Sequence, residues 1–363
     1  MKILQVMAGA EHGGAETAFE DMCLAMAERM KYDPTLEIHA AIKNGHPQRL
    51  KRLEDGGITV HALPFGGALD LYTPWKLGKI ISAFKPDIVQ TWMSRAAKKT
   101  PASKNKAYLK FSRLGGYYSI KYFASTDYFV TITPDIKRHL EDQGVPSDHV
   151  RHINNFAETE EVTHTISRQD MNTPEDACVV LALSRYHQAK ALDTLILAVK
   201  DLDNVHLWLA GKGPMENDLK QLAKNLGIDH RVHFLGWRTD RAALLKAADI
   251  CAFPSRYEPF GTTFVQAWAQ RTPLICSKAQ GPSQFVKDGE DGLMFEIDDV
   301  DGLTHAINRL IKEKGLGDNL SQVGYERYLR EFSKEKTIDA YLNYYKDALK
   351  AEGMISPDAA NVA

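Results

Sequence analysis

The chain has 363 residues, more than one ordinary hydrophobic core accommodates, and this length predicts two domains of about 150–180 residues each. Charged residues make up 25% of the sequence and the formal net charge is −2, a balance that indicates neither a nucleic-acid-binding protein nor an acidic tail. The four cysteines are widely spaced and form no CxxC pair, so we expect buried, reduced thiols of a cytosolic protein.

The first 156 residues alternate short apolar runs with amphipathic segments. The amino terminus is typical of a first strand and not of a signal peptide, and no apolar run approaches the ~20 residues that a membrane span needs. Strands are expected at 3–7, 38–42, 59–63, 88–91, 108–111, 128–131 and 150–153, and helices at 15–30, 75–84 and 135–143. This alternation predicts a parallel sheet covered on both faces.

The alternation stops at residues 157–176, a polar segment that we interpret as a linker, and resumes over residues 177–333. Strands are expected at 178–183, 206–209, 232–235, 250–253, 274–276 and 292–295, and helices at 192–200, 215–226, 241–247, 263–270 and 300–312. The segment over 319–350 is expected to be helical, with 334–350 as the last helix, and the tail over 351–363 is expected to fray. Ligands of such sheets bind at the carboxyl ends of the strands, so a cleft between the domains is the expected site.

Two cations, Arg185 and Lys190, come between the first strand of the second domain and the helix that follows. A strand end delivers side chains to a cleft, and a helix amino terminus favours anions. Arginine clamps a phosphate with two hydrogen bonds, and lysine adds a point charge. A solvated loop carrying two cations explains these residues equally well.

Two further segments follow strands of the second domain. Gly211 and Gly213, before a proline, let backbone approach a ligand, although a tight strand-to-helix turn needs the same glycines. Glu258 lies in a Pro/Gly turn before a helix that begins near Thr262. The free N–H groups of that helix suit a phosphate, Glu258 suits sugar hydroxyls, and Gln266 lies one turn further along. A capping carboxylate is the competing interpretation of Glu258.

The order of these segments resembles the retaining GT-B glycosyltransferases of family 4. The motifs run nearly the length of the chain: Gly13-Gly14-Ala15-Glu16, Ser184-Arg185…Lys190, Gly211-Lys212-Gly213-Pro214, Val232-His233-Phe234-Leu235-Gly236, Glu258-Pro259-Phe260-Gly261 and Gln280-Gly281-Pro282. The resemblance implies two Rossmann-like, doubly wound α/β domains that face each other across a cleft. It also implies that the last helix returns to the first domain.

The resemblance further implies transfer of a hexosyl unit from a UDP-, GDP- or ADP-sugar to a glycan or glycolipid, such as lipopolysaccharide or another cell-envelope glycan, with retention and without a metal or other cofactor. It assigns Arg185 and Lys190 to the diphosphate and Glu258 to the sugar as the catalytic set. The donor-binding positions that it implies are Gly13, Gly14, Gly211, Gly213, Phe260, Gly261, Thr262 and Gln266. A sugar-nucleotide 2-epimerase of this fold and a non-catalytic nucleotide-sugar-binding relative remain alternatives.

Two departures from the family pattern concern the site. Gln266 stands where relatives carry a glutamate that binds the ribose, and an amide cannot form the charge-assisted hydrogen bond. The expected strand ends near Gln90 and Arg113 carry no histidine, although many relatives place one there. A retaining enzyme whose leaving phosphate takes the acceptor proton needs no dedicated base.

A basic stretch without acids runs from Arg95 to Lys121. Its eight cations are Arg95, Lys98, Lys99, Lys104, Lys106, Lys110, Arg113 and Lys121, and aromatic residues such as Tyr117 are interleaved. We interpret Arg95, Lys98, Lys99, Arg113 and Tyr117 as a patch for the acceptor or for an anionic membrane surface, against the alternative of a solvated loop. The expected location is cytoplasmic, peripheral on the inner face of the cytoplasmic membrane, with no nucleic-acid partner.

Overall fold

The computed structural model describes residues 1–11, 13–157, 162 and 164–356. The chain divides into two compact units. Unit 1 comprises Met1–Asn155 together with Lys334–Ala363, and unit 2 comprises Phe156–Ser333. Among the described helices, none is both long enough and apolar enough to cross a membrane.

Unit 1 is built on a seven-stranded sheet of order β3-β2-β1-β4-β5-β6-β7 in which all pairs are parallel. The strands are β1 (Lys2–Met7), β2 (Glu37–Lys43), β3 (Thr59–Leu63), β4 (Ile88–Trp92), β5 (Leu109–Leu114), β6 (Tyr128–Thr131) and β7 (Val150–His152). The helices are α1 (Gly14–Met30), α2 (Pro47–Asp55), α3 (Tyr72–Phe84), α4 (Met93–Lys99), α5 (Pro134–Glu141) and α12 (Lys334–Ala351).

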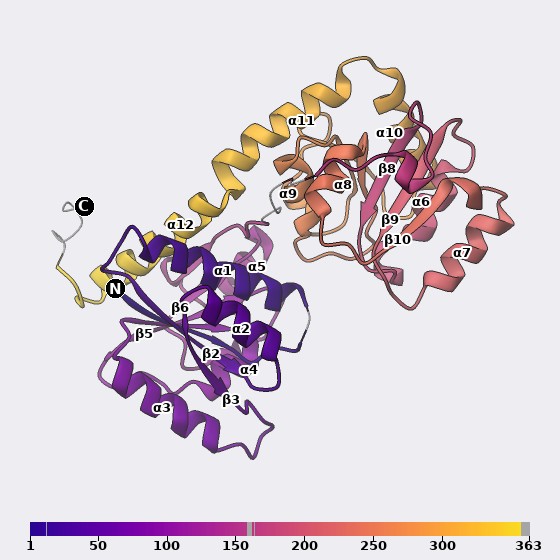
Figure 1. Ribbon diagram of the computed structural model, residues 1–363. Coiled ribbons are helices and arrows are strands. Elements are labelled where there is room, and N and C mark those ends of the chain that lie inside the picture. Colours follow the sequence, from indigo (N-terminus) through magenta and orange to yellow (C-terminus); the bar gives the residue numbers. More distant parts are fainter. Residues whose placement is uncertain (12, 158–161, 163, 357–363) are drawn as a thin grey trace. The chain divides into compact units, whose positions relative to one another are not determined.

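Both faces of this sheet are covered (Figure 1). Successive side chains of a strand point to opposite faces. Leu4 and Val6 of β1 therefore pack in one apolar cluster with residues of α3 and α4. Gln5, between them, faces the other way, where its side chain accepts a hydrogen bond from Trp92 Nε1 (2.8 Å) and contacts Met26 of α1.

Helix α12 completes unit 1, although it follows unit 2 in the sequence. Tyr345 is buried on the sheet, where its hydroxyl donates to Gln90 Oε1 (2.9 Å) and its ring meets Phe111 edge-on, with centroids 4.8 Å apart. The tail was expected to fray from residue 351. Ala351 instead ends α12, and the next residue, Glu352, accepts a hydrogen bond from the Tyr128 hydroxyl (3.2 Å). Residues 357–363 lie outside the described part of the chain.

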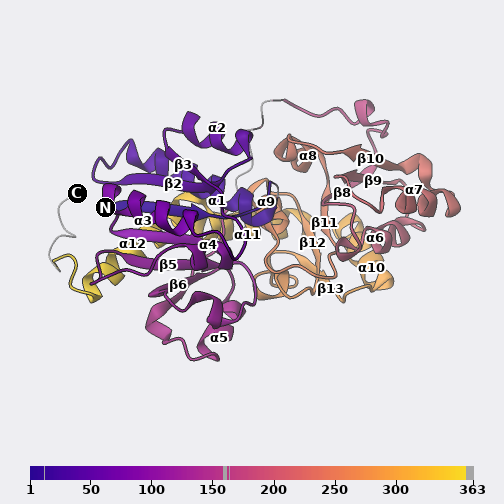
Figure 2. The ribbon, with the colours of Figure 1, turned by 90° about the horizontal axis from the view of Figure 1, so that it is seen from below.

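Unit 2 contains a six-stranded sheet of order β10-β9-β8-β11-β12-β13, again with parallel pairs only (Figure 2). The strands are β8 (Cys178–Leu183), β9 (Val205–Ala210), β10 (Val232–Gly236), β11 (Ile250–Phe253), β12 (Leu274–Ser277) and β13 (Leu293–Phe295). The helices are α6 (Leu192–Val199), α7 (Glu216–Asn225), α8 (Arg241–Ala247), α9 (Thr262–Ala269), α10 (Val300–Lys312) and α11 (Leu316–Arg327), and a π-helical turn (Tyr328–Phe332) follows α11.

Two doubly wound α/β units of this kind confirm the predicted fold class. Every strand expected from the sequence is present within one or a few residues of its expected bounds. Helices α2 and α4 are additions, and α4 turns the beginning of the basic stretch into a helix.

The predicted linker, residues 157–176, is only partly described, because 158–161 and 163 lie outside the described residues. Its second half packs on unit 2. The Arg168 guanidinium donates to both carboxylate oxygens of Asp249, each at 3.0 Å.

Candidate functional site

Four segments that follow strands of unit 2 meet at the carboxyl edge of its sheet. They follow β8, β9, β11 and β12, which are neighbours in the sheet. Because all strands are parallel, their carboxyl ends share one edge, and open sheets of this class bind ligands there. The positions proposed from the sequence as catalytic or donor-binding in the second half of the chain lie on or directly after these segments, or in helix α9, which begins at this edge.

The segments after β8 and β9 are joined through Tyr186. Its N–H donates to the Lys212 carbonyl (3.0 Å), and its buried hydroxyl donates to the Leu209 carbonyl (2.7 Å). A Cβ at Gly211 would lie 1.9 Å from the Ser184 carbonyl oxygen, and one at Gly213 would lie 2.3 Å from that of Tyr186. Both glycines are thus required by the packing of two backbones, which is the turn interpretation of this motif.

The segments after β8 and β11 are held together by backbone and by charge. The N–H groups of Arg256 and Tyr257 donate to the Ala189 carbonyl at 2.9 and 3.3 Å. Directly beside these bonds, the Lys190 ammonium forms an ion pair with the Glu258 carboxylate, and both side chains are largely buried. The structure therefore brings Lys190, predicted to bind the donor diphosphate, into direct contact with Glu258, predicted to bind the donor sugar.

A neighbouring arginine, Arg256, is already bound by two carboxylates of the protein. Its guanidinium donates to both oxygens of Asp193, at 3.0 and 2.9 Å, and pairs with Asp298 at 2.7 Å. Arg185, in contrast, is exposed and forms no ion pair with the described residues. Arg185 is thus a cation at this edge that is available to an anionic ligand.

Helix α9 begins at the same edge. Gly261, its N-cap, has a φ of 89°, a left-handed conformation that favours glycine, and a Cβ there would lie 2.6 Å from the Phe253 ring. The Gly281 N–H donates to the Glu258 carbonyl (2.8 Å) and fixes the turn before the helix. No side chain caps α9, so the N–H groups of its exposed first residue, Thr262, and of the residues after it are open to an anion.

Three polar side chains near this edge have no hydrogen-bonding partner among the described residues, and the hydroxyls of two of them are buried. Gln266 of α9 is 4% exposed, and its amide forms no hydrogen bond within the described part of the chain. The hydroxyls of Ser184 and Ser255 are buried and lack partners among the described residues as well. Buried polar groups are normally hydrogen-bonded. No role was proposed for either serine from the sequence, because only the packing of the two strand ends reveals their burial.

The glycine-rich turn after β1 in unit 1 is shaped by Glu16. The carboxylate of this buried residue accepts a hydrogen bond from the Ala10 N–H (2.8 Å). A Cβ at Gly9 or Gly13 would lie 2.5 or 2.3 Å from its carboxylate oxygens, whereas a Cβ at Gly14 would meet nothing within 4 Å. Sequence reasoning named this residue only as part of a motif, and the structure shows that it holds the turn against β1.

The basic stretch does not form one exposed patch. Arg113, predicted as part of a patch, is 2% exposed, stacks over Trp92 at 4.4 Å and donates to Asn155 Oδ1 (2.7 Å). Lys110 is fully buried, and its ammonium donates to the Ala97 and Thr100 carbonyls at 2.7 and 2.9 Å. Both residues belong to β5, an interior strand of the sheet whose two faces are covered, so their charges are not presented at the surface.

The other predicted patch residues are distributed over different elements. Arg95 and Lys98 are exposed on α4, whereas Lys99 is half-buried and binds the backbone of the loop between β3 and α3. Tyr117, partly exposed, contacts the His139 ring edge-on, with centroids 5.3 Å apart. Burial lowers the pKa of Lys110 to about 8 and lowers the pKa of Arg113.

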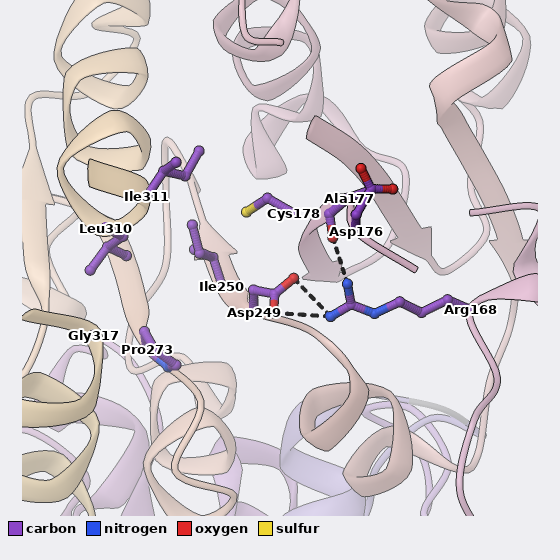
Figure 3. Close-up of a pocket in the computed structure, with 10 residues that line it drawn as sticks. All are labelled: Arg168, Asp176, Ala177, Cys178, Asp249, Ile250, Pro273, Leu310, Ile311 and Gly317. Carbon is purple, nitrogen blue, oxygen red and sulfur yellow. Dashed lines mark hydrogen bonds and ion pairs between the residues drawn. The ribbon is translucent and has the colours of Figure 1, made fainter. Parts of the chain in front are cut away.

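A pocket of unit 2 lies at the opposite, amino-terminal edge of the sheet (Figure 3). It is lined by Arg168, Asp176, Ala177, Cys178, Asp249, Ile250, Pro273, Leu310, Ile311 and Gly317. Arg168 and Asp249 point toward each other there and satisfy one another. Because this edge is opposite the strand ends where the predicted residues converge, we place the candidate site at the carboxyl edge.

Known proteins resemble the chain over almost its whole length. A family model described as "Glycosyltransferase Family 4" matches residues 12–161, and one described as "Glycosyl transferases group 1" matches residues 164–327. LpsE of Rhizobium meliloti (strain 1021), a lipopolysaccharide core biosynthesis glycosyltransferase, is 36% identical over 345 residues, covering 94% of this chain and 98% of LpsE.

Solved structures share the fold. A glycosyltransferase from Rickettsia africae ESF-5 superposes with a TM-score of 0.82 at 19% identity, over 96% of this chain and 98% of that one. HepE from Anabaena, solved in complex with UDP-glucose, superposes with a TM-score of 0.76 at 20% identity, over 97% of this chain and 100% of that one. At these identities the likeness concerns the fold alone.

Proposed function

Because the chain belongs to the group 1, family 4 type of GT-B glycosyltransferases, we propose that it transfers a hexosyl unit from a nucleotide-diphosphate sugar to a lipopolysaccharide core or other cell-envelope glycan, with retention. The lipopolysaccharide acceptor is supported by the name of its relative LpsE, and the donor class by HepE, whose structure contains UDP-glucose. The enzyme class itself follows from the family.

The observation that carries the proposal is the convergence of Arg185, Lys190, Glu258 and the amino terminus of α9 at one sheet edge. Negative charge develops on the departing diphosphate during transfer, and fixed positive groups at that position stabilise the transition state. Arg185 and Lys190 supply two such charges, and the open N–H groups of α9 supply dipoles of the same sign.

The Lys190–Glu258 ion pair suits a site in which each of these two side chains releases the other and binds the donor instead. With donor bound, the Lys190 ammonium turns to phosphate oxygens and the Glu258 carboxylate accepts hydrogen bonds from sugar hydroxyls. Each group thereby keeps a partner in both states, so neither is left buried and unpaired.

The proposed transfer needs no reactant other than the nucleotide-sugar donor and the acceptor hydroxyl. The bond between the anomeric carbon and the phosphate oxygen breaks, and the acceptor oxygen attaches to the same face of the sugar. The acceptor proton passes to the leaving phosphate. We expect the product to keep the anomeric configuration of the donor, which proton NMR of the product measures, and we expect EDTA to leave the rate unchanged.

Released nucleotide from a panel of UDP-, GDP- and ADP-sugars, with and without lipopolysaccharide acceptor, tests the proposal. We expect acceptor-dependent release with one donor, reduced about 10²–10³-fold by Arg185→Ala or Lys190→Ala, because each removes a charge that stabilises the transition state. Lys224→Ala, an exposed lysine of α7, is the matched control. Formation of an epimer or a free sugar would instead identify an epimerase, and binding without product would identify a non-catalytic relative.

A further inference from the structure

Two nitrogen-bearing side chains at the amino terminus of α2 are shielded from water without a full set of hydrogen-bonding partners. Arg49 is 4% exposed, and its Nη1 has no partner among the residues that the structure describes. Neither ring nitrogen of the half-buried His46, the residue directly before α2, has a described partner either. Buried polar groups are normally paired by protein, water or a ligand. These nitrogens, gathered in one helical turn, therefore mark a candidate site for a polar ligand.

The two residues lie at the carboxyl edge of the first sheet. Residues 44–46 lead from β2 to α2, and β2 pairs with β1, whose carboxyl end carries the glycine-rich turn. Open sheets of this class bind ligands at that edge. Helices α1 and α2 lie side by side (Figure 1) and are joined by a hydrogen bond from Arg49 to Glu20. Because His46 and Arg49 are three residues apart at the start of one helix, they lie on the same side of it.

The Arg49 guanidinium is fixed from two directions. Its Nε donates to Glu20 Oε1 of α1 (2.7 Å), and its Nη2 donates to the carbonyl of Glu11 in the turn after β1 (2.9 Å). The Glu20 carboxylate also accepts from Arg52 (2.8 Å), so its charge is divided between two guanidinium groups. The remaining nitrogen, Nη1, keeps a fixed direction. A donor that is already ordered suits an anion, because binding then costs little further ordering.

His46 and the helix end add hydrogen-bonding groups to Arg49. A neutral imidazole offers one N–H and one acceptor nitrogen, and a protonated imidazole offers two N–H groups. No side chain caps α2, and its first residue, Pro47, has no N–H. The N–H groups of Gln48 and Arg49 have no acceptor within the helix and favour an anion at this end.

We propose that His46, Arg49 and the amino terminus of α2 bind an acidic group, a phosphate or a carboxylate, on the acceptor glycan. The acid accepts hydrogen bonds from Arg49 Nη1 and from the His46 ring, which turns toward it about its Cβ–Cγ bond. The inference rests on the proposed transfer and deepens it, because it states the chemistry of the acceptor. Both residues bind and position the acceptor and take no part in breaking the bond to the leaving diphosphate.

Other ligands fit this site less well. A neutral sugar hydroxyl accepts a hydrogen bond but brings no negative charge to a buried guanidinium. A metal ion would meet the positive charge of Arg49, and the described residues form no cluster of histidine, cysteine and carboxylate side chains able to hold one. The diphosphate of the donor is the remaining competitor, so the test includes UDP.

Histidine NMR of the full-length protein tests the site without any measurement of catalysis. The histidines are labelled with ¹³C at Cε1, and of the 13 in the chain His46 is identified by its absence from the spectrum of His46→Gln. Glucose 6-phosphate or glucuronate should shift the His46 signal, and whichever acts distinguishes a phosphate site from a carboxylate site. Glucose and UDP should leave the signal in place. Arg49→Lys should weaken binding of the acid about tenfold or more, because lysine does not reproduce the fixed guanidinium.

Acceptor kinetics provide the second test. With a lipopolysaccharide acceptor, His46→Gln and Arg49→Lys should each raise KM about tenfold and change kcat less than about twofold, because the interaction is the same in the ground state and the transition state. With an acceptor whose phosphates have been removed and whose carboxyl groups have been reduced, both variants should match the wild type. Failure of transfer with every acceptor would count against the proposed function, whereas the NMR shift decides the site independently.

Matched controls exist for both variants. Arg52→Lys changes an exposed arginine of the same helix, which pairs with Glu20 and Asp21, and His305→Gln changes an exposed histidine of unit 2. Both should bind the acid and the acceptor like the wild type, and thermal unfolding shows whether each variant is folded. If Arg49→Lys does not fold, the wild-type NMR titration and His46→Gln still decide. No shift of the His46 signal with either acid, a shift with UDP, or equal KM ratios for native and neutralised acceptor would overturn the proposal.

Discussion

At the residue scale, Gln266 and Glu16 are both buried polar residues, but only Glu16 has a hydrogen-bonding partner within the described part of the protein. Gln266 is buried in α9 without an internal hydrogen bond, at a position where relatives are expected to carry a glutamate for the ribose. Glu16 is buried as well, but its carboxylate is occupied by the Ala10 N–H. The first side chain is available to a ligand, and the second is committed to the fold.

Replacing Gln266 by glutamate should strengthen nucleotide-diphosphate binding a few-fold. A carboxylate accepts hydrogen bonds from both ribose hydroxyls with charge assistance, which an amide cannot do. Isothermal titration measures the dissociation constant. Gln221→Glu on the exposed face of α7 is the matched control. Markedly weaker binding by Gln266→Glu would show that this position does not face the ribose.

Gly13→Ala should lower the free energy of unfolding by about 1–3 kcal/mol, because the new methyl group displaces the Glu16 carboxylate and leaves the Ala10 N–H unpaired. Chemical denaturation followed by circular dichroism measures this change. Gly14→Ala, one residue later, adds a methyl group that meets nothing within 4 Å and should be tolerated. Equal stability of the two variants would contradict the role given to Glu16.

At the scale of elements, the pairing of β9 with β10 places two histidines side by side. The rings of His206 and His233 are stacked, with centroids 5.3 Å apart, and a hydrogen bond joins His206 Nδ1 and His233 Nε2 (3.0 Å). Burial, and next the neighbouring His206, lower the pKa of His233 to about 4. The packed strands therefore favour the neutral ring.

A depressed pKa of His233 makes stability depend on pH in a defined window. The contribution of neutral His233 to the free energy of unfolding is fully present above about pH 6.5, the pKa of a histidine in the unfolded chain. This contribution is lost as the pH falls toward 4, because the unfolded chain then binds the proton more readily than the folded protein does. Between pH 6.5 and pH 4, the free energy of unfolding of His233→Gln should fall by about 1–2 kcal/mol less than that of the wild type. This value allows for solvent screening, because the ring is partly exposed. Thermal unfolding across this window, with exposed His305→Gln as control, measures it. An unchanged slope would contradict the assignment.

At the scale of the whole molecule, the chain leaves unit 1, builds unit 2 and returns to complete unit 1 with α12. The returning helix is held by buried contacts, of which the hydrogen bond from Tyr345 to Gln90 is the most specific. Folding of unit 1 thus requires residues that are more than two hundred positions apart in the sequence.

Tyr345→Phe should lower the free energy of unfolding by about 1–2 kcal/mol, because it removes the donor that satisfies the buried Gln90 side chain. Tyr32→Phe, at an exposed tyrosine of unit 1, should have almost no effect. Denaturant titration of both variants measures the difference. A neutral Tyr345→Phe would show that α12 is attached by its apolar contacts alone.

The sequence by itself determined the strands, the fold class and the order of the motifs, because buried parallel strands appear as short apolar runs and tight strand-to-helix turns require glycine at set places. It also identified the residues that meet at the carboxyl edge of the second sheet. It could not show that Arg113 and Lys110 are buried, that Gly211 and Gly213 are required by backbone packing, or that the ring nitrogens of His46 are buried. Those facts were decided only by the tertiary structure, because burial depends on which distant segments cover a residue, whereas hydrophobic periodicity is a local property of the chain.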